Sequence, residues 1–150
     1  MPNVLEYNQL QEILPHAYPF LLIDRVIDFK RGEYLIAEKL ITGNEWALDD
    51  SAVDDTAAPM NCFPEVLLIE AAAQAALVIY HLSKVLPGEK IKYLLGKIKT
   101  VFFQPAAIGD VLSINAEATK MLQTGGYSNI KIKREKSEIA EVFITYKVLR

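Results

Sequence analysis

The sequence has very little of what metal centres and disulfide frameworks need. Its 150 residues include one cysteine, Cys62, and two histidines, His16 and His81. A lone cysteine excludes an intramolecular disulfide, and the cysteine and histidines do not have the spacing of a zinc site. A chain of this length buries roughly two thirds of its surface on folding and needs neither a disulfide nor a metal ion for stability. We therefore expect a single domain over residues 1–150, with no metal or redox cofactor.

Targeting signals and long apolar runs are also scarce. The first seven residues contain no basic stretch followed by an apolar core, so no signal peptide is predicted. The most hydrophobic stretch, residues 66–82, is slightly short for a membrane span and contains Glu70 and Gln74. We interpret it as a buried helix of a cytoplasmic protein.

Positive charge is missing from one long part of the chain. No lysine or arginine occurs between Lys39 and Lys84, whereas seven acidic residues do. The whole chain has a net charge of −3 and a pI near 5.4. This balance argues against nucleic acid as the main partner.

Apolar periodicity predicts an α+β fold. We expect a short amphipathic helix near residues 10–14, then strands over residues 20–27 and 33–42. Residues 43–63 show no periodicity, which is typical of a functional loop. Strand-like segments follow at residues 97–102, 112–116, 130–133 and 142–148, with Gly125-Gly126 as a hairpin turn before the third.

The strongest prediction is a helix from about Pro64 to Lys84. Proline suits the first turn of a helix, Glu65 favours its N-terminal dipole, and Pro87-Gly88 ends it. The segment is apolar on nearly every face and rich in alanine, so it should be buried all round, with other backbone close by. The pattern as a whole predicts one long helix embraced by an antiparallel sheet.

Three motifs resemble the bacterial (3R)-hydroxyacyl-acyl carrier protein dehydratases. They are LPHAYPFLLIDRV at residues 14–26, PEVLLIEAAAQA at 64–75, and FQP at 103–105 followed by Gly109-Asp110. The three occur in the family's order. The resemblance implies a hot-dog fold, an antiparallel sheet wrapped around one long central helix, and a homodimer or larger homo-oligomer with sites at its interface. It also implies a β-hydroxyacyl substrate held as an acyl carrier protein or coenzyme A thioester.

The resemblance places the chemistry near the start of the central helix. Glu70 is the family's catalytic carboxylate, and the N–H of Val66 is the expected donor to the thioester carbonyl. Gln74, one helical turn after Glu70, and His16 of the first motif are expected to bind substrate. Because Glu70 lies in an apolar helix, we expect burial to raise its pKa, which would suit proton donation. We also expect Glu70 to face a narrow apolar tunnel.

One residue of the family's pattern is missing. Family members carry a histidine just before the central helix, where an ungapped alignment from Glu70 places Thr56. His81 cannot replace it within one subunit, because eleven helical residues span about 16 Å. An aspartate of residues 49–55, or Cys62 as a thioester nucleophile, are further candidates. We therefore expect weak or atypical dehydratase activity.

Three functions stay open. The chain is a hydroxyacyl-thioester dehydratase, or a non-catalytic hot-dog subunit that binds acyl chains, or an acyl thioesterase in which Glu70 activates water. An acidic carrier protein would need a basic surface to dock on, and solvated strand faces explain the same residues equally well. The candidate basic residues are Lys97, Lys99, Lys131, Lys133 and Arg134.

Overall fold

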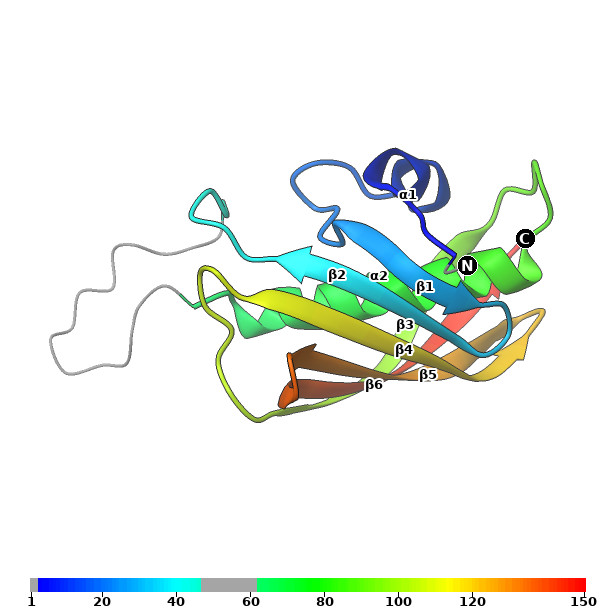
Figure 1. Ribbon diagram of the computed structural model, residues 1–150. Helices are drawn as coiled ribbons and strands as arrows, with labels where there is room; N and C mark the ends of the chain where they lie inside the picture. Colours follow the sequence, from blue (N-terminus) through cyan, green and yellow to red (C-terminus); the bar gives the residue numbers. More distant parts are fainter. Residues whose placement is uncertain (1–2, 47–61) are drawn as a thin grey trace, which may run out of the picture.

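The computed structural model describes residues 3–46 and 62–150, which form a six-stranded antiparallel sheet wrapped around one long helix (Figure 1). The strand order is β1-β2-β4-β5-β6-β3. The elements are α1 (Tyr7–Ile13), β1 (Arg25–Lys30), β2 (Tyr34–Leu40), α2 (Glu65–Lys84), β3 (Lys92–Phe102), β4 (Val111–Leu122), β5 (Gly125–Arg134) and β6 (Ser137–Leu149). This is the α+β hot-dog arrangement expected from the sequence.

The central helix α2 has the predicted bounds to within one residue. Pro64 is its N-cap residue and Glu65 is the acidic residue of its first turn. Ala72, Ala75 and Ala76 are completely buried, which lets the helix lie close to the sheet. By length and composition alone α2 could cross a membrane, but most of it is buried inside the fold. A core helix of this kind is weak evidence for a membrane span.

Strand β1 begins later than the sequence predicts. The expected strand over residues 20–27 is instead an irregular segment followed by β1, which starts at Arg25. The apolar residues Leu21, Leu22 and Ile23 are buried, yet the backbone groups of Phe20 and Leu22 bond to the Gln74 side chain of α2. Pairing with β2 begins at Asp24, whose N–H donates to the carbonyl oxygen of Glu38 at 2.9 Å. The apolar run of residues 20–23 is therefore buried without being a strand.

Glycines next to the β4–β5 hairpin do not form its turn. The turn residues are Gln123 and Thr124, and Gly125 and Gly126 open β5. A Cβ atom on Gly126 would lie 2.1 Å from the carbonyl oxygen of Lys120, so the glycine allows the two strands to approach. The predicted turn position was wrong by two residues for this reason.

Strand β3 lies at one edge of the sheet and is longer than predicted. It begins at Lys92, and its pairing with β6 is irregular between Leu95 and Ile98. Leu94, Leu95 and Ile98 are exposed by 51%, 43% and 40%. An unpaired strand edge with this much exposed apolar surface is suited to pairing with another chain.

The predicted loop over residues 43–63 falls mostly outside the described residues, as do Thr56 and the aspartates at 49–55. Its two described ends are held by the fold. Glu45 forms an ion pair of 2.8 Å with Lys39, and both side chains are almost fully buried. At the other end Cys62 forms a β-bridge with Ala107.

Candidate active site

Glu70 lies in the second turn of α2, where two side-chain nitrogens approach the same carboxylate oxygen. His16 Nε2 is 3.0 Å from Glu70 Oε1. Gln74 Nε2 donates to Glu70 Oε1 at 3.1 Å. The side chains of His16 and Glu70 are 24% and 33% exposed, so the pair lies at the border between the core and the surface. The structure therefore brings together three of the four predicted site residues.

Gln74 is wholly buried, and its amide group joins α2 to the first motif. Its Oε1 accepts the N–H of Leu22 at 2.9 Å, and its Nε2 donates to the carbonyl oxygen of Phe20 at 2.7 Å. The remaining N–H points to Glu70. Both N–H groups are thus engaged within the protein, and a direct contact between Gln74 and substrate stays a prediction.

The pKa of Glu70 is shifted in the direction opposite to the expected one. The hydrogen bond from His16 is the largest influence and lowers the pKa. Partial burial raises it, but the hydrogen bond from Gln74 and the charge of His16 lower it further, and the sum is a lowered pKa. The expected raised pKa was wrong because the apolar helix places Glu70 at its border, within reach of two donors.

His16 is the least predictable member of the site. The sequence placed it in the first motif, but its spacing from Glu70 gave no signal of a direct contact. Its Nδ1 is buried and has no hydrogen-bond partner in the part of the chain that the structure describes. The imidazole therefore acts on the site through Nε2, which faces Glu70.

Val66 lies in the first turn of α2 and is 70% exposed. The first backbone N–H of the helix with a carbonyl partner is that of Leu67, which reaches Pro64 at 3.0 Å. The preceding N–H, that of Val66, makes no backbone hydrogen bond to any described residue. Such an N–H at a helix N-terminus can polarise a carbonyl group. The proposed contact with a thioester stays a prediction.

Trp46 is a site neighbour that the sequence analysis did not single out. Its Nε1 donates to the carbonyl oxygen of Pro19 at 3.1 Å. Its ring packs edge-on against Phe20, with the centroids 5.4 Å apart. Trp46 thereby contacts residues 19–20 from the solvent side, and Gln74 bonds to Phe20 and Leu22 from the core side.

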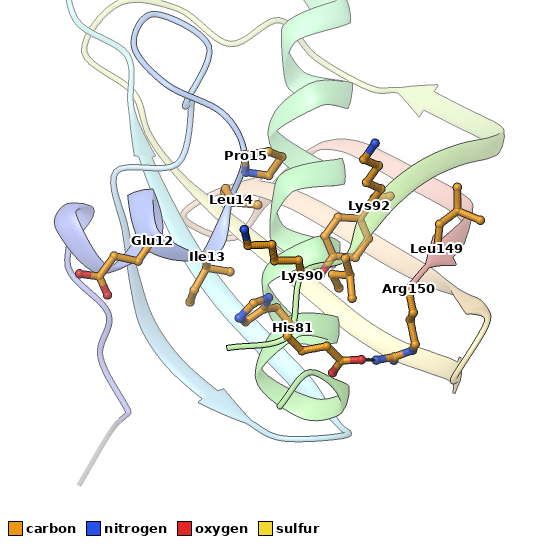
Figure 2. Close-up of a pocket in the computed structure, with 12 residues that line it drawn as sticks. Glu12, Ile13, Leu14, Pro15, His81, Lys90, Lys92, Leu149 and Arg150 are labelled. Carbon is orange, nitrogen blue, oxygen red and sulfur yellow. Dashed lines mark hydrogen bonds and ion pairs between the residues drawn. The ribbon is translucent and has the colours of Figure 1, made fainter. Parts of the chain in front are cut away.

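His81 lies at the other end of α2, away from Glu70. It borders a cavity of about 680 Å³, and Figure 2 shows it there with Lys90 and Arg150. Burial lowers the pKa of His81. Glu70 lines none of four cavities found among the described residues, and the expected tunnel beside it stays a prediction. The described residues also contain no cluster of side chains suited to a metal ion.

The third motif, residues 103–105 and 109–110, stabilises the turn before β4. Arg134 forms an ion pair of 2.8 Å with Asp110 and donates to Gln104 Oε1 at 3.1 Å. Asp110 also accepts the N–H of Ala107, so these residues fix the turn before β4. Of the candidate docking residues, Arg134 is thus engaged internally and Lys131 is paired with Glu138 at 3.8 Å.

Comparison with known proteins identifies the family. Residues 8–146 match the family model of the ApeP-like dehydratases, described as ApeP dehydratase. The 3-hydroxyacyl-acyl-carrier-protein dehydratase FabZ of Protochlamydia amoebophila is 40% identical over 151 residues, covering 95% of this chain and 92% of the relative. The chain belongs to the hydroxyacyl-acyl carrier protein dehydratase family. The resemblance inferred from the three motifs is confirmed.

Two solved structures share the fold of this dehydratase-like protein. The dehydratase heterocomplex ApeI:P from Xenorhabdus doucetiae has a TM-score of 0.70 and 16% identity, covering 100% of this chain and 92% of that chain. A mutant of thioesterase PA1618 from Pseudomonas aeruginosa has a TM-score of 0.68 and 14% identity, covering 97% and 94%. At these identities the similarity shows the hot-dog fold alone.

Proposed function

We propose that the protein dehydrates (3R)-hydroxyacyl thioesters and that Glu70 is its catalytic carboxylate. The observation that carries the proposal is the contact of Glu70 with His16 and Gln74 at the start of the central helix, within a chain of the dehydratase family. The reaction removes a proton from the α-carbon and the hydroxyl group from the β-carbon, and it releases an enoyl thioester and water. The N–H of Val66 polarises the thioester carbonyl and acidifies the α-proton.

The proposed substrate is carried by an acyl carrier protein, as the name of the FabZ relative states for that enzyme. We place the protein in the cytoplasm, in fatty-acid or related lipid biosynthesis. Lys97 and Lys99 are exposed on β3 and form no ion pair with a described residue, whereas Lys131 and Arg134 do. The β3 lysines are therefore the better candidates for an acidic carrier protein to contact.

A homodimer is part of the proposal. Strand β3 presents an unpaired edge with exposed leucine and isoleucine side chains. Pairing of two such edges would cover this surface and continue the sheet. The weak activity expected from the missing family histidine stays a prediction, because Thr56 lies outside the described residues.

The decisive experiment is a turnover assay with the Glu70→Gln variant. A 3-hydroxyacyl thioester is incubated with wild-type protein, and the enoyl thioester and free thiol are measured separately. We expect enoyl product from the wild type and a loss of about a hundred- to ten-thousand-fold in Glu70→Gln, the usual range for one acid–base group. Unchanged circular dichroism shows that the variant is folded.

Other products would contradict the proposal. Free thiol without enoyl product would identify a thioesterase. Neither product, together with tight binding of the acyl thioester, would identify a non-catalytic acyl-binding protein. Full activity of Glu70→Gln would remove Glu70 from the mechanism.

A further inference from the structure

The two oxygens of the Glu70 carboxylate are not equivalent. Oε1 receives both nearby side-chain donors, His16 Nε2 and Gln74 Nε2. Oε2 has no hydrogen bond to any residue in the described ranges, and the side chain is one-third exposed. Oε1 is therefore the oxygen that the described residues hold, and we take Oε2 as the oxygen that meets a ligand.

Both donors come from a rigid frame. The amide of Gln74 is oriented by the backbone of Phe20 and Leu22, so its second N–H has a fixed direction. His16 precedes these residues in the same segment, and the apolar side chains of residues 21–23 anchor that segment in the core. The orientation of Glu70 is thus set by the packing of the first motif against α2.

We propose that His16 and Gln74 are positioning residues that hold Glu70 through Oε1, so that Oε2 is the atom that takes the α-proton. This inference rests on the proposed dehydratase function and assigns its proton transfers. The α-carbon–hydrogen bond breaks, and its electron pair forms the carbon–carbon double bond as the β-carbon–oxygen bond breaks. The proton passes to Oε2 and then to the departing hydroxyl group, which leaves as water. Glu70 returns to the carboxylate form, and nothing is oxidised or reduced.

This assignment accounts for the missing family histidine. A single carboxylate that first accepts and then returns the proton needs no second acid–base group. The lowered pKa of Glu70 fits this order of events, because the carboxylate must be ionised before it can accept a proton. The role of proton donor in the resting state, expected from the sequence, is thereby replaced by the role of base.

The pH dependence follows directly. A group with a lowered pKa is ionised above that pKa, so activity is lost as pH falls through it. Among the described residues, His16 is the only charged or titratable group that influences the pKa of Glu70, and Gln74 adds a neutral donor. Removing either donor should raise the pKa of Glu70 and move the acidic loss of activity to higher pH.

The test measures the pKa of Glu70 independently of activity. Protein carrying ¹³C-labelled glutamate carboxyl groups is titrated by NMR, and the signal of Glu70 is identified by its absence in Glu70→Gln. We expect the midpoint to move to higher pH in His16→Ala and Gln74→Ala. His16→Gln, which keeps a donor, should restore part of the shift. His81→Ala and Gln11→Ala serve as controls that change the same residue types away from the site.

Kinetics then separates the inference from the proposed function. The acidic limb of kcat/KM should move in parallel with the NMR midpoint in both variants. An unchanged midpoint in His16→Ala, whose side chain is near the surface, would overturn the inference even if Gln74→Ala failed to fold. Shifted midpoints without turnover of any hydroxyacyl thioester by the wild type would overturn the proton-transfer role and the proposed function together, while the hold on Oε1 would stand. If the wild type turns over substrate but the acidic limb of kcat/KM does not move with the NMR midpoint of Glu70 in the variants, the inference is overturned and the proposed function is not.

Discussion

At the scale of single residues, buried polar contacts organise the region around Glu70. Gln74 satisfies two backbone groups of the irregular segment before β1. Lys39 and Glu45 form a second polar contact, with side chains only 8% and 11% exposed. Lys39 also lies 5.5 Å from the ring centre of Phe63, directly before α2. The polar contacts thus join β2, the first motif and the start of α2.

The Lys39–Glu45 pair gives a stability prediction. Lys39→Met leaves Glu45 buried without its counter-charge and should lower the free energy of unfolding by about 3 kcal/mol. Lys30→Met is the matched control, because Lys30 pairs with Glu33 at 2.6 Å on the surface. Loss of such an exposed pair should cost less than about 1 kcal/mol. Urea unfolding at one fixed protein concentration compares the two, and equal losses would contradict the role of burial.

At the scale of elements, close backbone approach decides where the strands turn and bend. Gly125 and Gly126 are needed because β4 and β6 pass so near that a side chain would collide with their backbone. At Gly96 in β3 the close neighbour is a side chain instead, because a Cβ atom there would lie 2.6 Å from Thr145 Oγ1. Lys97 donates its N–H to that hydroxyl at 2.7 Å, at the irregular point of the β3–β6 pairing.

Replacing Gly126 tests this account of the hairpin. Gly126→Ala should destabilise the protein by about 1–3 kcal/mol, since the backbone of Lys120 must move to admit a methyl group. Gly43→Ala is the control, because a Cβ atom there would meet nothing within 4 Å. Thermal unfolding measures both. A Gly126→Ala variant as stable as the control would show that the strands do not approach this closely.

At the scale of the whole molecule, β1 and β3 are the two edge strands of the sheet, and β3 is the more exposed of the two. The strands β2, β4, β5 and β6 carry the buried alternating residues of the core, whereas β3 is exposed along most of its length. The exposed residues of β3 include both apolar side chains and lysines. We interpret the apolar ones as the contact with a second copy.

Sedimentation tests this interpretation. The wild type should sediment at micromolar concentration with at least twice the 16.8 kDa mass of one chain. Ile98→Asp should shift the equilibrium toward the monomer, because it places an unpaired charge in the interface. Val111→Asp, at a comparably exposed apolar residue of β4, should leave the mass unchanged. A monomeric wild type would contradict the proposed dimer, whereas a hexamer would agree with it.

The sequence by itself determined the features that depend on local patterns. The bounds of α2 follow from Pro64, Glu65 and Pro87-Gly88, and the buried face of β6 follows from its alternation of apolar residues. The motifs identified the family and singled out Glu70 as the candidate catalytic carboxylate. These signals are readable because helix ends, periodicity and short motifs are properties of neighbouring residues.

Only the tertiary structure decided the chemistry around Glu70. Its contact with His16, its lowered pKa and the irregular path of residues 14–24 depend on groups that are far apart in the chain. An apolar helix predicts burial and a raised pKa, but the helix position relative to the first motif determines whether donors reach the carboxylate. Burial raises the pKa of Glu70 and hydrogen bonding lowers it, and the distances between the side chains set the balance.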